Sequence, residues 1–192
     1  LYPEKFIRTN INGVFNLLNI AKNFWMKSPH NVNTQYEHAR FHQISTDEVY
    51  GSINSGSFNE NSPYMPNSPY SASKASADFL VRSFNETYGL NTVISICSNN
   101  YGLNQNIEKF IPKVIYCLKN NIEIPVYGNG KNIRDWIFVI DHCRAIDIIY
   151  NFSQNGKTYN VGANQELNNL ELIELICNVS GLKPKIKFVS DR

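Results

Sequence analysis

The segment Thr92 to Cys97, with the sequence TVISIC, places the strongest constraint on the fold of this chain. It is apolar at most positions, and it follows a long helical pattern, 70–88, that ends at Gly89. Glycine is common just past the C-terminus of a helix. A strand that is apolar on both sides is typical of a parallel sheet covered by helices on both faces. The segment therefore predicts a parallel sheet.

Strand and helix patterns largely alternate along the rest of the chain, as an α/β fold requires. The helical pattern from Pro3 to Met26 has one broad apolar face. The segment 52–69 is rich in Ser, Asn, Gly and Pro and predicts an irregular loop of the kind that often covers a ligand. The segment 31–40 predicts a second loop, and 128–130 a turn. Helices are predicted at 3–26, 70–88, 107–118, 141–151 and 170–180, and strands at 41–45, 92–97, 122–127, 133–139, 159–161 and 185–189.

Composition excludes several functional classes. The 192 residues are 42% hydrophobic, which is enough for a sizeable core. The net charge is +2 without a dense basic run, so no nucleic-acid partner is expected. No apolar stretch reaches the ~20 residues of a membrane-spanning helix. Four widely spaced cysteines indicate reduced thiols, not a disulfide framework or a metal site, and hence a cytoplasmic protein: Cys97, Cys117, Cys143 and Cys177.

Two adjacent acids, Asp47 and Glu48, follow the predicted strand 41–45 directly, with Thr46 between. The carboxyl ends of strands in an open parallel sheet are where ligands bind. An alternative is that these residues cap a helix and place acids in its first turn, where the helix dipole favours them. The strand context favours a catalytic role.

Tyr70 and Lys74 are four residues apart and share one face of their predicted helix, with a rise of about 6 Å between them. A lysine ammonium near a phenol lowers the pKa of the phenol, so Tyr70 is predicted to act as a base near neutral pH. Taken alone, the spacing also fits an aromatic residue and a solvated lysine. Together with Asp47 and Glu48, it predicts an active site.

These segments resemble the extended short-chain dehydrogenase/reductase family, and within it the nucleotide-sugar 4,6-dehydratases. The Thr-Asp-Glu triplet separates these enzymes from the related 4-epimerases. The segments that carry the resemblance are STDEVYG at 45–51, PYSASKA at 69–75, SNNYG at 98–102, EKFIP at 108–112, YGNG at 127–130 followed by RDW at 134–136, and YNVG at 159–162.

The resemblance implies a doubly wound parallel sheet of the Rossmann type. Residues 1–100 would form the C-terminal part of an NAD-binding domain, and residues 101–192 mostly a smaller, interleaved α/β lobe for the nucleotide sugar. The cofactor implied is NAD, and the partner a second copy of the chain, joined through helices 3–26 and 70–88. The family's glycine-rich NAD-binding turn is not in this sequence and would lie upstream of Leu1, so the chain is expected to be the central part of a longer enzyme and inactive alone.

The reaction implied by the resemblance converts dTDP-glucose, or UDP-glucose, to a 4-keto-6-deoxy sugar. Tyr70 would take the proton of the 4-hydroxyl, Thr46 would hydrogen-bond the same oxygen, and Lys74 would hold the cofactor ribose while hydride leaves C4. Glu48 would then abstract the C5 proton, and a protonated Asp47 would protonate the departing 6-hydroxyl. Hydride would finally return to C6. Rhamnose for cell-surface polysaccharide is a common destination of such deoxysugars.

Further contacts are implied for residues that match the family's motifs. Without the resemblance, Asn99 and Asn160 also fit turn formers, Lys109 a solvated helix residue and Arg134 a surface charge. The cofactor would be bound by Tyr70, Lys74 and Asn100, and the substrate by Thr46, Asn99, Glu108, Lys109, Phe110, Pro112, Tyr127, Arg134 and Asn160. Ile96 and Leu103 depart from the family, which usually has arginine and proline there.

Two other functions stay open at this point. A nucleotide-sugar 4-epimerase or decarboxylase would share Tyr70 and Lys74, and a truncated, non-catalytic dimerisation module would need neither. The full set of Thr46, the acid pair, Tyr70 and Lys74 favours the dehydratase. The choice between a thymine and a uracil nucleotide stays open as well.

Overall fold

The computed structural model describes residues 2–190, which form two compact units. The first unit consists of Leu1–Cys97 and Cys143–Val161, and the second of Ser98–His142 and Gly162–Arg192. The chain thus leaves the first unit and returns to it before ending in the second. The assignment of a cofactor role to one part of the chain and a sugar role to the other stays a prediction.

The first unit is built on a three-stranded parallel sheet. Its strands are β3 (Phe41–Thr46), β4 (Thr92–Cys97) and β8 (Thr158–Val161), in the order β3-β4-β8. Every residue of β4 is buried, as the apolar sequence of this strand predicts. Thr46 lies opposite Cys97, and Cys97 opposite Val161. The three strands therefore end together at one edge of the sheet.

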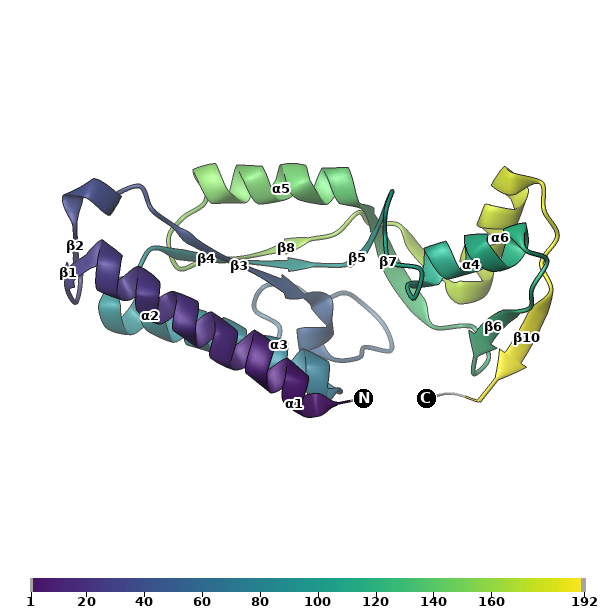
Figure 1. Cartoon of the computed structure of the whole chain (residues 1–192), viewed down its shortest axis with the longest axis horizontal. Helices are drawn as coiled ribbons and strands as arrows, with labels where there is room; N and C mark the ends of the chain where they lie inside the picture. The colour runs from purple at the N-terminus through teal and green to yellow at the C-terminus, as the bar shows by residue number, and fades with distance from the viewer. Residues whose placement is uncertain (1, 191–192) are drawn as a thin grey trace. The chain divides into compact units, whose positions relative to one another are not determined.

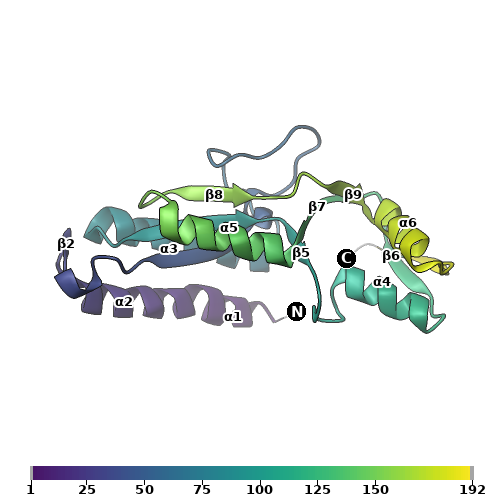
Figure 2. The same cartoon turned by 90° about the horizontal axis from the view of Figure 1, so that it is seen from above.

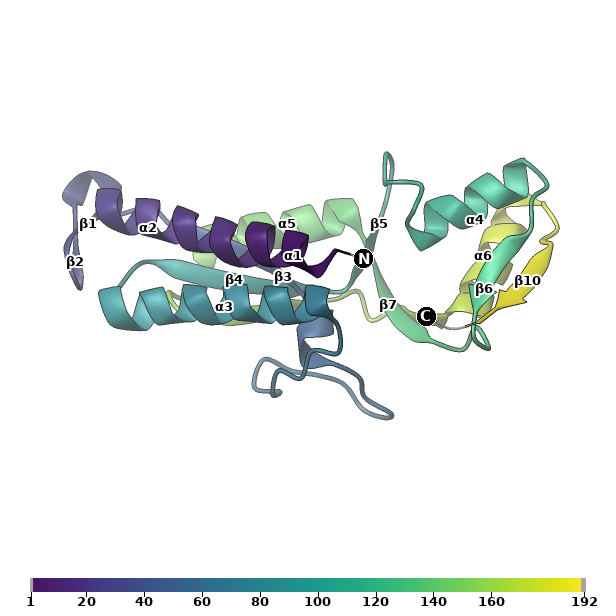
Figure 3. The same ribbon diagram turned by 60° about the horizontal axis from the view of Figure 1, so that its bottom comes forward.

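Helices cover both faces of this sheet, so the prediction of an α/β, doubly wound fold is confirmed. The N-terminal helix and α3 (Pro69–Tyr88) lie on one face, and α5 (Val139–Phe152) lies on the other (Figures 1 and 2). The N-terminal helix runs through α1 (Pro3–Phe6), the π-helical stretch η1 (Ile7–Asn12) and α2 (Gly13–Trp25). Figure 3 shows it side by side with α3.

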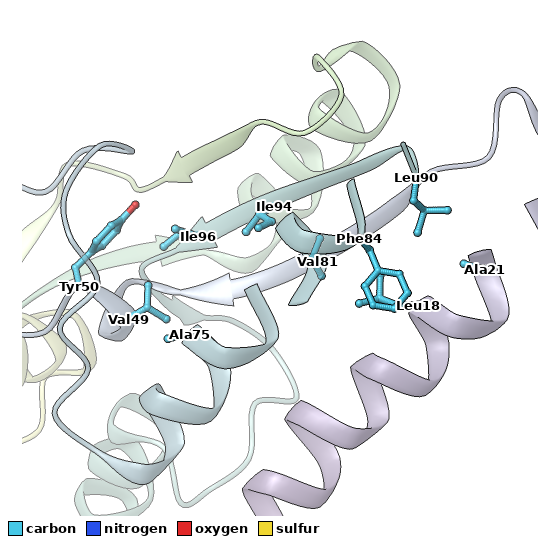
Figure 4. Packing of buried hydrophobic residues seen from close by; sticks show 10 residues of the cluster. All are labelled: Leu18, Ala21, Val49, Tyr50, Ala75, Val81, Phe84, Leu90, Ile94 and Ile96. Carbon is cyan, nitrogen blue, oxygen red and sulfur yellow. The ribbon is translucent and has the colours of Figure 1, made fainter. Parts of the chain in front are cut away.

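The core of the first unit lies between this helix pair and the sheet. Its side chains come from α2, from α3 and from β4, as well as from the turn that follows β3, and they pack against one another (Figure 4). Burial of each large aliphatic side chain stabilises the fold by about 1.5–3 kcal/mol. The cluster comprises Leu18, Ala21, Val49, Tyr50, Ala75, Val81, Phe84, Leu90, Ile94 and Ile96.

The start of α3 is fixed by a capping box. The Ser68 side chain accepts a hydrogen bond from the backbone N–H of Ser71 at 3.1 Å, and the Ser71 hydroxyl accepts one from the backbone N–H of Ser68 at 3.0 Å. Pro69 occupies the first turn, where its missing N–H costs nothing. The helix ends at Gly89 with a φ of 72°, as the sequence predicts. This start places Tyr70 in the first turn.

Several short elements escape the sequence analysis. The predicted loop 31–40 contains β2 (Asn31–Val32), which pairs antiparallel with β1 (Met26–Ser28), and the 3₁₀ turn η2 (Thr34–Tyr36). A second 3₁₀ turn, η3 (Asp47–Tyr50), follows β3. Elements of two to four residues are too short to show a periodic pattern.

The second unit contains two smaller sheets. In one, β5 (Asn99–Tyr101) pairs parallel with β7 (Ile133–Phe138), and β7 pairs antiparallel with β9 (Glu166–Asn168). In the other, β6 (Ile124–Tyr127) pairs parallel with β10 (Ile186–Val189). Helices α4 (Phe110–Lys119) and α6 (Asn169–Ser180) complete the unit. Its core comprises Val114, Cys117, Leu118, Ile124, Val126, Ile173 and Cys177.

Boundaries in this unit differ from the prediction. The helix predicted at 107–118 begins at Phe110, because Lys109 has an extended backbone with a ψ of 155°. The strand predicted at 122–127 begins at Ile124, because Asn121 adopts a φ of 56° and Ile122 is still bonded to the Cys117 carbonyl. Strands β5 and β9 were not predicted, since both are polar and three residues long.

Two findings concern the whole described chain. Across residues 2–190, no helix is long and apolar enough to cross a membrane. All four cysteines are free thiols, and three of them are buried.

Candidate active site

Thr46, Asp47 and Glu48 lie where β3 ends and η3 begins. The Thr46 hydroxyl accepts a hydrogen bond from the Glu48 backbone N–H at 3.4 Å and donates to Asp47 Oδ1 at 3.3 Å. Thr46 is therefore the N-cap, and the two acids occupy the first turn of a short helix, as the capping alternative predicts. They also lie at the carboxyl edge of a parallel sheet, where ligands bind, and their catalytic role stays a prediction.

The loop after η3 is tied back to this strand end. Gly51 adopts a φ of 86°, and a Cβ at this position would overlap the Met65 carbonyl oxygen. Met65 in turn donates its backbone N–H to the Val49 carbonyl at 2.9 Å. The Tyr50 ring stacks on Phe58, with their centroids 5.1 Å apart. The predicted loop 52–69 is thus packed against the candidate site.

Tyr70 and Lys74 project from the first two turns of α3 and are both partly buried. The Tyr70 ring meets the Phe6 ring edge to face, with centroids 5.6 Å apart. The Lys74 ammonium donates to the Ile44 carbonyl of β3 at 2.6 Å. This bond joins α3 to β3 two residues before Thr46, so the helix that carries Tyr70 and Lys74 is attached to the strand that ends at the triplet.

The electrostatics of Tyr70 differ from the prediction. The pKa of the phenol is raised, first by burial and then by the charges of Glu48, Cys97 and Asp47. In this structure, which holds no cofactor, the direction is opposite to the one expected from Lys74 and a bound nicotinamide together, and the Lys74 ammonium is bonded to the Ile44 carbonyl. Burial also lowers the pKa of Lys74, while Asp78 opposes that change. Glu48 and Asp47 therefore act electrostatically on the phenol.

Asp78 is a site residue that the sequence analysis missed. It is 2% exposed, its Oδ2 accepts hydrogen bonds from the Ser45 hydroxyl at 2.5 Å and the Tyr64 hydroxyl at 3.3 Å, and burial raises its pKa to about 6. Two signals point to it. It follows Tyr70 and Lys74 on one helix face, and the buried positions of β3 are the polar Gln43 and Ser45.

Asn160, predicted to contact the nucleotide, lies in β8 and not in a turn. Its side-chain oxygen accepts a hydrogen bond from the Tyr50 hydroxyl at 2.8 Å, and its backbone N–H donates to Glu60 at 2.8 Å. The pKa of Tyr50 is raised to about 12, chiefly by burial. Asn160 therefore holds the aromatic cluster around Tyr50 in place, and its contact with a nucleotide stays a prediction.

The second unit gathers some of the remaining predicted residues around β7. Asn99 lies in β5 opposite Trp136, and the Phe110 ring lies 6.2 Å from the Trp136 ring. Arg134 is exposed on β7 and donates to the Ile133 carbonyl at 2.8 Å. Lys109 is exposed at the N-cap of α4. Glu108 and Pro112 flank the same helix start, and Tyr127 ends β6.

Asn100, predicted to contact the cofactor, is bonded within the second unit. Its Oδ1 lies 2.8 Å from His142 Nδ1, and its amide donates to the Ser98 carbonyl at 3.2 Å. His142 is 6% exposed, and burial lowers its pKa. The roles of these second-unit residues in ligand binding stay predictions.

Known proteins with similar sequences identify the family of this chain. Residues 2–189 match the family described as GDP-mannose 4,6 dehydratase. The dTDP-glucose 4,6-dehydratase of Xanthomonas campestris pv. campestris strain B100 is 48% identical over 176 residues, which are 91% of this chain and 49% of that protein. The dTDP-glucose 4,6-dehydratase of Neisseria meningitidis serogroup B is 45% identical over 202 residues, covering 98% of this chain and 56% of that protein.

A solved structure agrees with these relatives. The dTDP-glucose 4,6-dehydratase of Streptomyces venezuelae, crystallised with NAD bound, superposes with a TM-score of 0.90 at 38% identity, over all of this chain and 56% of that one. The chain spans about half the length of the relatives it matches. The resemblance to nucleotide-sugar dehydratases is confirmed, and the chain belongs to the GDP-mannose 4,6 dehydratase family.

Proposed function

We propose that this chain carries the catalytic residues of an NAD-dependent dTDP-glucose 4,6-dehydratase. The observation that carries the proposal is the junction of β3 and α3. There the charges of Glu48 and Asp47 raise the pKa of the partly buried Tyr70 phenol, and Lys74 is bonded to the Ile44 carbonyl of β3. A 4-epimerase needs a base for the 4-hydroxyl, whereas a dehydratase also needs a second base and an acid. The acid pair supplies both.

The residues present fit a nicotinamide dinucleotide. A parallel sheet binds such ligands at its carboxyl edge, and the Lys74 ammonium has two further hydrogens for a ribose diol besides the one donated to Ile44. Tyr70 and Lys74 would hold the nicotinamide ribose, and Asn100 is proposed as a further contact. When bound, NAD would accept hydride from C4 of the sugar and return it to C6.

The chain's own residues would move the protons. Tyr70 would accept the proton of the 4-hydroxyl, with the Thr46 hydroxyl hydrogen-bonded to the same oxygen. Glu48 would remove the C5 proton, which a 4-ketone makes acidic, and Asp47 would donate a proton to the departing 6-hydroxyl. One water is lost, and the product is a 4-keto-6-deoxy sugar. The hydrogen bond from the Thr46 hydroxyl to Asp47 Oδ1 supports a fixed orientation of this acid.

Substrate contacts are proposed for the second unit and for β8. An exposed guanidinium at Arg134 suits phosphate oxygens, which it binds with planar, two-pronged geometry. The amides of Asn99 and Asn160, with Lys109 and Tyr127, would complete the contacts to the nucleotide and the sugar. The relatives named dTDP-glucose 4,6-dehydratase favour a thymine nucleotide over a uracil nucleotide.

We also propose that the protein is a cytoplasmic homodimer. The helix pair of the first unit carries a groove lined by Ile11, Ser76, Phe79, Leu80 and Ser83. Large apolar side chains of the same two helices are exposed, including Phe79 of the groove at 55%, Ile7 at 51% and Phe24 at 62%. Apolar faces of this kind mark interaction sites. A second copy of the same helix pair is the partner that the family resemblance implies.

The assay that tests the proposed function measures the mass of the product. The whole protein is incubated with NAD and dTDP-glucose, and in parallel with UDP-glucose and GDP-mannose. Dehydration gives a product lighter by one water, whereas an epimerase gives a product of unchanged mass. Absence of water loss with all three sugars would contradict the dehydratase, and preference for UDP-glucose or GDP-mannose would contradict dTDP-glucose as the substrate.

A further inference from the structure

Asp78 is a buried carboxylate to which the proposed reaction assigns no role. It is 2% exposed, although aspartate is seldom buried unless it is paired. It lies four residues after Lys74 and eight after Tyr70, so the three side chains follow one face of α3. Asp78 therefore lies one helical turn after Lys74, on the same side of α3 as the proposed catalytic residues.

The hydrogen bonds of Asp78 come from two different elements. Oδ2 accepts from the Ser45 hydroxyl of β3 at 2.5 Å and from the Tyr64 hydroxyl of the loop 52–68 at 3.3 Å. Oδ1 is buried, and within residues 2–190 no donor reaches it at ordinary hydrogen-bond geometry, although the Gln43 side chain also lowers the pKa of this carboxyl. A buried carboxylate oxygen without a partner destabilises a fold. The protein therefore keeps a group here that stability alone does not favour.

The buried side chains of β3, the strand to which Asp78 is bonded, are polar. Along β3 the buried side chains are Gln43 and Ser45, both polar, whereas Ile44 between them is 42% exposed. Buried positions of a parallel strand are usually apolar, so two polar side chains there depart from the rule. The backbone of Ile44 accepts the Lys74 ammonium at 2.6 Å. Asp78 and Lys74 are thus both bonded to β3 immediately before Thr46.

The charges around this pair come from several elements. Lys74 is the cation that acts on Asp78, and its effect lowers the pKa of the carboxyl. Asp78 acts in return to raise the pKa of Lys74, against the lowering by burial, and Cys97 of β4 acts in the same direction as Asp78. Asp78 also raises the pKa values of two tyrosines, Tyr64 of the loop and Tyr50 of η3. Glu48 and Asp47 act on Tyr70.

We propose that Asp78 is a positioning residue, the buried counter-charge that keeps Lys74 protonated and directed at the end of β3. The geometry supports it, because Ser45 fixes the carboxylate on β3 and Ile44 fixes the ammonium on the same strand. A protonated Lys74 then has hydrogens to donate to a ribose hydroxyl. This catalytic consequence rests on the proposed function, whereas the electrostatic effect of Asp78 on Lys74, four residues away on α3, does not.

The pairing is tested by the titration of Lys74 itself. The chain is labelled with lysine carrying ¹³C at the ε position, and the Lys74 signal is assigned by its absence in Lys74→Arg. In Asp78→Asn, which keeps the shape of the side chain, the Lys74 midpoint should fall by about one pH unit. The control Glu86→Gln, an exposed acid on the same helix, should leave it unchanged. An unchanged midpoint in Asp78→Asn overturns the proposal.

A second measurement uses the unaltered chain and does not depend on the folding of a variant. The Lys74 signal should show a small additional step near pH 6, as Asp78 loses its proton. A Lys74 signal without that step overturns the proposal even if Asp78→Asn does not fold.

The catalytic consequence is tested in the whole protein with NAD and dTDP-glucose. The alkaline limb of the kcat/KM profile should move to lower pH in Asp78→Asn by the same amount as the Lys74 midpoint. If the Lys74 midpoint shifts in Asp78→Asn while the alkaline limb of the kcat/KM profile stays in place, the proposed catalytic consequence is overturned. If the unaltered protein removes water from none of the three sugars, the proposed function fails, while the titration still decides on the role of Asp78.

Discussion

At the scale of single residues, the surroundings of Tyr70 disfavour the ionised form of its phenol. Burial and the neighbouring carboxylates of Glu48 and Asp47 raise the pKa of its phenol, so that it holds its proton at neutral pH. A positive charge brought close to the ring would lower that pKa. We therefore expect Tyr70 to act as a base only when a cationic ligand is bound.

Glu48 is expected to be needed for elimination and not for oxidation. In Glu48→Gln the amide is not a base, so the dehydrated product should fall by about 10²–10⁴-fold. Oxidation at C4 should continue, because Tyr70 remains and has lost a negative neighbour. Mass spectrometry of the product and absorbance of reduced nicotinamide measure the two steps. Glu86→Gln serves as the control, and full dehydration by Glu48→Gln would remove Glu48 from this role.

Asp78 is expected to lower stability at neutral pH. Its folded pKa of about 6 lies above the ordinary value of 3.8, so between these values the folded state binds the proton more tightly than the unfolded state. The stabilisation that comes from this tighter proton binding is complete below about pH 4 and is lost as the pH rises through 6. Asp78→Asn should therefore raise the free energy of unfolding by about 1–3 kcal/mol at pH 8 and change it little at pH 4.

Urea unfolding at both pH values measures the effect of Asp78→Asn. The exposed Glu86→Gln should be close to neutral at each pH. An Asp78→Asn protein that is less stable than the unaltered chain at pH 8 would show that the carboxylate is stabilising in its ionised form.

At the scale of elements, β3 and α3 hold the site together. The capping box at Ser68 and Ser71 fixes where α3 starts, and the bonds from Lys74 to Ile44 and from Ser45 to Asp78 fix it against the strand. The turn at Gly51 then brings the loop 52–68 back over the strand end. Each of these contacts lies within a few residues of a proposed catalytic group.

Gly51 is expected to be intolerant of a side chain. In Gly51→Ala the positive φ and the overlap with the Met65 carbonyl act together, so the loss of stability should be about 3 kcal/mol or more. Gly56 is a matched control, because its φ of 87° is almost the same while the nearest atom to an added Cβ is Ile53 Cδ1 at 3.8 Å. Gly56→Ala should cost about 1 kcal/mol. Thermal unfolding measures both, and equal losses would show that the loop is not packed on Gly51.

At the scale of the whole molecule, the helix pair of the first unit is expected to form the dimer contact. Phe79→Glu places a charge in its apolar groove, and burial of an unpaired charge is unfavourable, so the variant should be monomeric. Phe152→Glu is the control, since Phe152 is 80% exposed on α5. Sedimentation measures the masses. A monomeric unaltered protein, or a Phe79→Glu variant that remains dimeric, would contradict the proposed contact.

The isolated 192-residue chain is expected to show negligible turnover. Its sequence contains no glycine-rich turn of the kind that holds a dinucleotide pyrophosphate at a helix N-terminus, so NAD should bind weakly. Calorimetry of NAD binding and the product assay check this. Conversion of dTDP-glucose by the isolated chain would refute it.

Long, strongly patterned elements could be predicted from the sequence, because their periodicity reflects burial directly. The apolar β4, the helix α3 with its stop at Gly89 and the N-terminal helix are all found within one or two residues of the expected positions. Short elements such as β1, β2, β5 and β9 could not, because they are defined by hydrogen bonds to partners distant in sequence. The start of α4 at Phe110 likewise depends on the backbone of Lys109.

The sequence by itself determined the α/β class, the parallel sheet and the presence of Tyr70, Lys74 and the Thr46-Asp47-Glu48 triplet, since these follow from local patterns and spacing. Only the tertiary structure decided that the pKa of Tyr70 is raised, and which groups hydrogen-bond to Asp78 and Asn160. The physical reason is that a pKa depends on burial and on charges from other elements, and a hydrogen bond on atoms that folding brings together. Neither quantity is contained in the spacing of residues along the chain.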